Sequence, residues 1–272
     1  MLFKYRKEST MVIISTFGHD TSIMKPRRVM RYVLIYCSSG QVVMAIDDKE
    51  FSLRAGQLIT ITSGQIHYIK DLIQADGFIL EFTLDYFCKN DHDIELIFQN
   101  GLFCHFDLNE VISVDPVFIK EQLDQIHREI TLQPYQYLIS VHSRIELILV
   151  LINRTKVDRG DEIWKPEALF LKFLEAVRNN FHKQFNVVHW AEQLNTTETK
   201  LNELAKIHTG KTAQNVIYGL IASEAKRLLR YENLSVKEVS YKLGFNDPFY
   251  FSNFFKKQTA LSPKEYKAQY AL

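Results

Sequence analysis

An internal repeat near the C-terminus constrains the fold more than any other feature of this sequence. Its two copies begin at Ala191 and Ser240, about 49 residues apart. In each copy the small residue lets two helices cross closely, and Asn195 or Gly244 then supplies the left-handed backbone of a tight turn. Each copy therefore predicts a helix-turn-helix unit. The apolar positions that follow at helical spacing are Leu201, Leu204, Ala205, Phe251, Phe254 and Phe255.

The stretch between the two copies predicts one long helix, from about Thr212 to Tyr231. A helix of that length spans ~30 Å, and successive major grooves on one face of DNA lie ~34 Å apart. A stiff connector of this length suits two recognition helices that enter neighbouring major grooves. Residues 164–272 are therefore predicted to form an all-α DNA-binding domain with two helix-turn-helix units.

The same residues resemble the AraC/XylS-type bacterial transcription regulators. The resemblance covers roughly residues 164–272, and the sequence departs from the family pattern at Ala205, Leu220, Ala260 and Lys267. The second helix-turn-helix unit is the more typical of the two. The most specific matching runs are Ala225-Lys226-Arg227-Leu228-Leu229, Leu234-Ser235-Val236-Lys237-Glu238-Val239, Leu243-Gly244-Phe245-Asn246-Asp247-Pro248, Tyr250-Phe251-Ser252, Phe254-Phe255-Lys256-Lys257 and Leu261-Ser262-Pro263-Lys264-Glu265-Tyr266.

This resemblance implies a sequence-specific transcription regulator, for instance an activator, that works in the bacterial cytoplasm. It implies double-stranded DNA as a partner, contact with RNA polymerase, and a homodimer. It also implies that the N-terminal half is a cupin-like sensor or dimerisation domain that holds a small-molecule effector.

The solvent side of each recognition helix supplies the candidate DNA contacts. Family resemblance places base contacts at the positions of Thr199, Glu203, Phe249 and Asn253, and these side chains suit base edges or thymine methyl groups. Lysines along the same helices suit phosphates, which position a protein without reading sequence. For the aromatic pair at the start of the second helix, packing in the core is the alternative. The full candidate set is Thr199, Lys200, Asn202, Glu203, Lys206, Asn246, Asp247, Phe249, Tyr250, Asn253, Lys256 and Lys257.

The N-terminal half reads as many short strands, which favours a β-barrel or sandwich. The strand-like runs are 12–14, 32–36, 42–46, 58–61 and 78–82, and turn-forming residues separate them at 38–40, 47–49, 55–56 and 63–64. Two helices are predicted after the strands, at 115–131 and 134–154, and Asp115 with Pro116 begins the first. The chain is therefore α+β: a domain at 1–155, a polar linker at 156–163 and the helical domain at 164–272.

The second of those helices carries an apolar stripe at spacings of three and four residues. The stripe is a candidate dimer seam, and packing onto the chain's own barrel is the alternative. Its members are Leu138, Val141, Ile145, Ile148 and Ile152.

A small barrel can hold one small ligand, and we expect Tyr36, His67 and Phe82 to line an effector pocket. Residues 55–58 and 63–67 look like half of a cupin motif, but the metal-binding HxH-plus-Glu half is missing. His67 and Glu81 alone are too few for a metal site. We therefore expect no metal and no cofactor.

Composition separates the remaining classes of protein. Net charge is +1 for the whole chain, but −3 for residues 1–160 and +4 for 161–272, which agrees with a C-terminal DNA-binding domain. Three widely spaced cysteines fit a reducing compartment, and no run is apolar enough for a membrane. No catalytic motif appears, so we expect a regulator rather than an enzyme. The alternatives are a metal-independent cupin isomerase and an adaptor that does not bind DNA.

Overall fold

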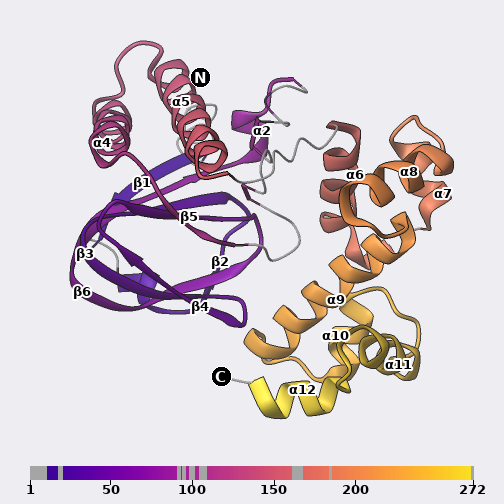
Figure 1. Cartoon of the computed structure of the whole chain (residues 1–272). Helices are drawn as coiled ribbons and strands as arrows, with labels where there is room; N and C mark the ends of the chain where they lie inside the picture. Colours follow the sequence, from indigo (N-terminus) through magenta and orange to yellow (C-terminus); the bar gives the residue numbers. More distant parts are fainter. Residues whose placement is uncertain are drawn as a thin grey trace. The chain divides into compact units, whose positions relative to one another are not determined.

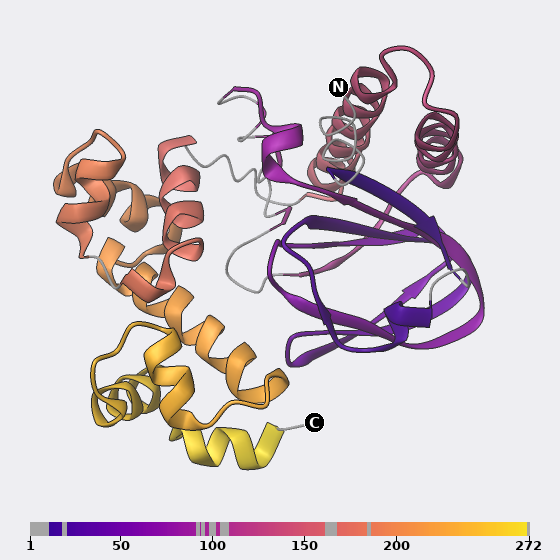
Figure 2. The same cartoon turned by 180° about the vertical axis from the view of Figure 1, so that it is seen from behind.

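The computed structural model describes residues 11–17, 21–90, 93, 96–97, 102–103, 109–160, 168–183 and 186–270. Cys104 and positions 161–163 of the expected linker lie outside these residues. The chain divides into two compact units, Met1–Lys165 and Pro166–Leu272. The first is built on a β-sheet followed by helices and the second on helices alone (Figures 1 and 2). The α+β class predicted from the sequence is therefore confirmed.

One antiparallel sheet of seven strands forms the frame of the first unit and curls round on itself (Figure 1). Its main path runs β1-β6-β3-β5-β7, with β2 paired to β6 and β4 to β3. A 3-10 helix η1 (Thr21–Met24) precedes β2, and a short helix α2 (Leu84–Phe87) follows β6. The strands are β1 (Val12–Thr16), β2 (Arg27–Arg28), β3 (Tyr32–Ile46), β4 (Lys49–Arg54), β5 (Gln57–Ile61), β6 (Ile66–Phe82) and β7 (Val111–Ser113).

Strand β3 does not stop at the turn expected at 38–40, so that prediction is wrong. The strand bends there, and its register against β6 shifts between Cys37 and Gln41. Gly40 has φ +68, and a Cβ there would lie 2.2 Å from the Gln74 carbonyl oxygen. A glycine thus lets the backbone of β6 approach, and the residues that resemble a turn form an irregularity inside one long strand.

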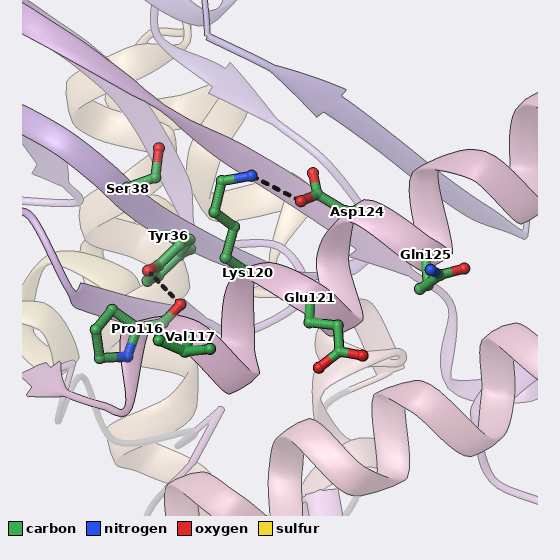
Figure 3. A pocket seen from close by; sticks show the side chains of 8 residues that line it. All are labelled: Tyr36, Ser38, Pro116, Val117, Lys120, Glu121, Asp124 and Gln125. Carbon is green, nitrogen blue, oxygen red and sulfur yellow. Dashed lines mark hydrogen bonds and ion pairs between the residues drawn. The ribbon is translucent and has the colours of Figure 1, made fainter.

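Alternate residues of the strands fill the inside of the curled sheet with one apolar core. Val33, Ile35 and Cys37 of β3 belong to it, together with Ile59 and Ile79 from the paired strands. The intervening residues of β3 face the other side, because successive side chains of a strand point to opposite faces. Tyr36 lies on that outer side, and its hydroxyl donates to the carbonyl oxygen of Pro116 (Figure 3).

Helices α4 (Pro116–Leu132) and α5 (Tyr137–Asp158) form a hairpin after the sheet (Figure 1). The predicted start of α4 is confirmed: Asp115 caps it by accepting from the backbone N–H groups of Val117 and Phe118, and Pro116 occupies the first turn.

The apolar stripe of α5 does not form an external seam. Val141, Ile145, Ile148 and Ile152 are all buried within their own unit. The alternative interpretation of the periodicity therefore holds for these four residues, and the dimer seam predicted at them is wrong. Leu138 is half-buried, and its part in a dimer stays a prediction. Helical spacing identifies a face that is covered, but it does not say which partner covers it.

Helix α5 also continues into the expected linker, since positions 156–158 are helical. An ion pair holds this part of the helix: the side chain of Lys156 is 8% exposed, and its Nζ donates to the partly exposed carboxylate of Glu110. Arg159 adds a second contact to Glu110 at 3.5 Å. These contacts tie the end of α5 to the residue just before β7.

The second unit contains seven α-helices within the described residues (Figure 2). Helix α9 lies between a first pair, α7 and α8, and a second pair, α10 and α11, and it contacts α6, α8, α10, α11 and α12. The helices are α6 (Ala168–Arg178), α7 (Val187–Gln193), α8 (Glu198–Thr209), α9 (Ala213–Tyr231), α10 (Val236–Lys242), α11 (Pro248–Thr259) and α12 (Pro263–Tyr270), with a 3-10 turn η3 (Phe181–Lys183) after α6.

Candidate DNA-binding interface

The repeat folds into two helix-turn-helix units, as predicted. Asn195 and Gly244 take left-handed φ values of 52° and 80° in the two turns, and Ala191 and Ser240 are buried where the helices cross. Ala260 ends α11 with φ 65°, a conformation that glycine adopts at less cost.

The first unit presents the solvent side of α8. Thr197 caps this helix by accepting from the Lys200 N–H. Of the candidate base contacts, Thr199 and Glu203 are exposed, as is Lys206. The Lys200 ammonium lies 4.0 Å from the Glu203 carboxylate, so this surface carries charges of both signs.

Asn202 differs from its expected role, because its side chain is already engaged inside the unit. Its oxygen accepts from the backbone N–H of Ala213 at 3.0 Å, and its amide nitrogen donates to the Glu198 carbonyl oxygen at 3.2 Å. Ala213 is the first residue of α9. Asn202 therefore joins α8 to the start of the connecting helix, and we interpret it as a positioning residue.

The second unit presents two aromatic rings at the start of α11. Asp247 caps the helix through the Phe249 N–H at 2.8 Å, so its carboxylate has a local structural role. Phe249 and Tyr250 are 67% and 69% exposed, with ring centroids 6.3 Å apart. The alternative of core packing therefore fails for both. Their neighbours Phe251 and Phe255 are the residues that α11 buries.

The remaining candidates on the second unit are also at the surface. Asn253 is exposed one turn after Phe249, and Lys256 and Lys257 are exposed in the last turn of α11. Asn246 is exposed in the turn before the helix. The face of α11 thus offers aromatic, amide and cationic groups in sequence from its N-terminus to its C-terminus.

Helix α9 sets the separation of the two helix-turn-helix units. It has 19 residues and is capped by Thr212, so it is roughly 28 Å long. Its buried residues include Leu220, Ile221, Leu228 and Leu229. A helix held by packing along its length is a stiff connector, in agreement with the sequence prediction.

Two capping boxes explain part of the specific sequence run. Ser235 and Glu238 exchange hydrogen bonds at the start of α10, and Ser262 and Glu265 do so at the start of α12. Hydrogen bonds from Ser235 lower the pKa of Glu238, and those from Ser262 lower that of Glu265. These residues therefore fix the helix ends on either side of α11.

The three residues expected to line an effector pocket do not share one site. Tyr36 lies opposite Phe78 in the β3–β6 ladder, Phe82 opposite Tyr32, and His67 opposite Ile46. Phe82 packs against Tyr32, Phe87 and Phe103. The predicted pocket is therefore wrong as a group, because the strand register separates its members.

His67 is a buried, neutral residue of the sheet. Its Nδ1 lies 3.2 Å from the Gln65 carbonyl oxygen, which requires the hydrogen to be on Nδ1, and Nε2 has no hydrogen-bond partner among the described residues. Burial and the nearby Arg27 guanidinium lower its pKa to about 4. In the described part of the chain no three His, Cys, Asp or Glu side chains are placed to hold a metal ion.

We expect His67 to make folding sensitive to acid. The unfolded chain takes up a proton at this residue below a pKa of about 6.5, whereas the folded chain does so only near pH 4. Stability is therefore complete above the unfolded pKa and falls as pH drops from about 6.5 to 4, by on the order of 3 kcal/mol. Denaturant titrations across this range should give a flatter pH dependence for His67→Gln. The control is His182→Gln, at an exposed histidine. If this variant keeps the wild-type dependence of the unfolding free energy on pH, the difference is due to His67.

Family models match both compact units of the chain. The model of the AraC-like ligand binding domain matches residues 11–142, and that of the helix-turn-helix domain matches residues 190–269. An uncharacterized HTH-type transcriptional regulator of Pseudoalteromonas carrageenovora is 32% identical over 119 residues, which are 44% of this chain and 70% of that protein. The chain belongs to the AraC/XylS family of transcription regulators.

Other relatives of this AraC/XylS-family regulator match over shorter shares of their length. The transcriptional activator RhaS of Mannheimia succiniciproducens is 33% identical over 89 residues, 33% of each chain. Histidine kinase P4 of Formosa agariphila is 29% identical over 106 residues, 39% of this chain and 8% of that protein. The crystal structure of ToxT from Vibrio cholerae with a bound unsaturated fatty acid has 12% identity and a TM-score of 0.42, covering 94% of both chains. Within the described residues, no helix combines the length and apolar character needed to cross a bilayer.

Proposed function

We propose that this protein regulates bacterial transcription by binding a specific DNA sequence with α8 and α11. The observation that carries the proposal is the pair of helix-turn-helix units joined by one packed 19-residue helix, each with an exposed recognition face. A connector of roughly 28 Å is close to the ~34 Å between successive major grooves. Contact with RNA polymerase and an action in the cytoplasm, where bacterial DNA lies, belong to the same proposal.

The division of labour on DNA follows from the chemistry of each helix. Thr199, Glu203, Phe249 and Asn253 are proposed to read bases, because they are exposed on the recognition helices. Asparagine can bond adenine through two hydrogen bonds, and an aromatic ring can contact a thymine methyl group. Lys206, Lys256 and Lys257 are proposed to contact phosphates.

The experiment that tests sequence reading is the exchange Asn253→Ala. It should lower affinity for an operator selected from a random DNA library by ~1–3 kcal/mol and leave binding to random DNA unchanged. Gel-shift titrations on both DNAs measure this. Asn233→Ala is the matched control, since Asn233 is exposed in the loop between α9 and α10. An equal loss on selected and random DNA would show that Asn253 does not read bases.

A homodimer is part of the proposal, but it needs a surface other than the buried stripe. Ile139 and Leu147 of α5 are 63% and 49% exposed and lie about two turns apart. Ile139→Lys with Leu147→Lys should therefore yield monomers in sedimentation experiments. The control Val188→Lys, one such change at an exposed position of the other unit, should leave the dimer intact. A dimer that survives the double change would require a different interface.

The N-terminal unit is proposed to receive a small-molecule effector, in keeping with its match to a ligand-binding domain. Ligand control requires different affinities for two states of the protein.

A further inference from the structure

The two recognition helices can be compared residue by residue. Each has 12 residues and begins after a capping side chain, Thr197 or Asp247. Each ends at a residue with a left-handed backbone, Gly210 or Ala260, so equivalent positions are 50 residues apart throughout. The exposed faces of α8 and α11 therefore share one geometry, and what distinguishes them is their side chains. The same offset relates two residues that each helix buries, Leu201 and Ala205 in α8 and Phe251 and Phe255 in α11.

The exposed start of α11 is suited to A·T pairs. Phe249 and Tyr250 are 67% and 69% exposed, and the thymine methyl group is the apolar feature of the major groove. Asn253 is exposed one turn after Phe249 and can hold adenine through two hydrogen bonds. Guanine is read mostly by arginine and lysine, but α11 has no arginine and its lysines lie in the last turn, whereas base contacts come from the N-terminal part of a recognition helix. The Asp247 carboxylate is engaged by the Phe249 N–H, so it does not direct α11 to cytosine.

The equivalent positions of α8 carry charges instead. Lys200 stands where α11 has Tyr250, and Glu203 stands where it has Asn253. The Glu203 side chain is 57% exposed, and its carboxylate lies 4.0 Å from the Lys200 ammonium. Because an ion pair at the surface contributes little, this contact leaves the carboxylate able to turn to a base. A carboxylate accepts from the cytosine amino group, and a lysine donates to guanine, so α8 is suited to a C·G pair.

We propose that the DNA site of one chain has two unlike halves about one duplex turn apart, with A·T pairs under α11 and a C·G pair under α8. The contrast between Glu203 and Asn253 carries this inference. The two side chains occupy equivalent exposed positions, but a carboxylate only accepts hydrogen bonds, whereas an amide both donates and accepts. A site that repeats one sequence would therefore suit only one of the two helices. The inference rests on the proposed function and specifies the class of DNA sequence that fits it.

Selection from a random duplex library by the full chain tests the composition of the two halves. The bound pool should converge on a site with one half rich in A·T pairs and one half with a C·G pair, their centres about 10 base pairs apart. Convergence on a repeat of one sequence, or on a site without the C·G pair, would overturn the inference.

Two isosteric exchanges then assign each half to its helix. Glu203→Gln replaces the carboxylate by an amide that suits adenine, so the preference for cytosine over adenine at the α8 position should fall by about tenfold or more. Asn253→Asp should shift the preference at the α11 position from adenine towards cytosine by a similar factor. The controls Glu192→Gln and Asn233→Asp make the same chemical changes at exposed positions outside the recognition helices and should leave both preferences unaltered. Preferences that neither exchange moves, or that the controls move equally, would overturn the assignment.

The same measurements separate this inference from the proposed function. All four exchanges are at exposed positions, so each variant should keep the wild-type melting temperature. A chain that binds no duplex, even at low salt, would overturn the proposed function together with the inference. A chain that binds DNA but selects other bases would overturn the inference alone, and DNA binding by α8 and α11 would stand.

Discussion

Reversing the charge of the two lysines at the end of α11 is expected to abolish most of the affinity for DNA. Lys256 and Lys257 are exposed in the last turn of the second recognition helix, where they suit phosphates. With Lys256→Glu and Lys257→Glu, two attractive contacts become repulsive, and we expect an affinity loss on the order of a hundredfold or more at low salt. Selected and random DNA should be affected alike, because phosphates carry no sequence information.

The salt dependence gives the sharper measurement. Each phosphate contact that is lost reduces the slope of log affinity against log salt by about 0.9, so the double variant should lose roughly 2 from the wild-type slope. Lys49→Glu with Arg54→Glu makes the same change in net charge on β4, which lies in the other unit. Equal losses from both variants would mean that overall charge, rather than contact by α11, drives binding. Wild-type binding that ignores salt would favour a protein adaptor instead.

A single methyl group at Gly77 should strongly destabilise the N-terminal unit. A Cβ there would lie 2.0 Å from the Tyr36 carbonyl oxygen and 2.6 Å from the Phe17 ring. The oxygen belongs to the β3 backbone, which is held by its antiparallel pairing with β6. Overpacking of this kind costs typically 1–3 kcal/mol and sometimes more, so we expect Gly77→Ala to lower the free energy of unfolding by about 3 kcal/mol. The corresponding fall in melting temperature is roughly 6–12 °C in calorimetry.

Gly219→Ala is the matched comparison, since the same methyl group meets open space there. No atom lies within 4 Å of a Cβ at Gly219, and the residue is in the middle of α9. Alanine should stabilise that helix by up to about 1 kcal/mol. A Gly77→Ala chain as stable as the wild type would show that β3 and β6 can separate without cost.

The C-terminal unit was predictable because its constraints are local. Ala191 and Ser240 at the crossings and Asn195 and Gly244 in the turns each act within a few residues, and the structure shows them in those roles. Because the pattern occurs in two copies, each of these interpretations had two independent examples in the sequence. The first turn of α4 was predictable for the same reason, because Asp115 caps its own neighbours.

Features that depend on distant partners were not predictable. At the irregularity of β3, Gly40 leaves room for the backbone of Gln74 in β6, and no short sequence pattern records that approach. The stripe of α5 indicated a covered face but not its partner. Ile139 and Leu147 are apolar residues off the stripe, and the structure shows that they are exposed. Asn202 was predicted to contact DNA from its position on α8 alone. Its hydrogen bond with the Ala213 N–H joins two helices, and the sequence of one helix does not show such a bond.

Helix α9 contacts α8 on one side of the repeat and α10 and α11 on the other. This one helix therefore supports both recognition helices, α8 and α11. Damage to it would disable the two halves together rather than one after the other. The same sharing fixes their rotational phase, so a cognate operator has to keep its two half-sites at a constant interval along the duplex.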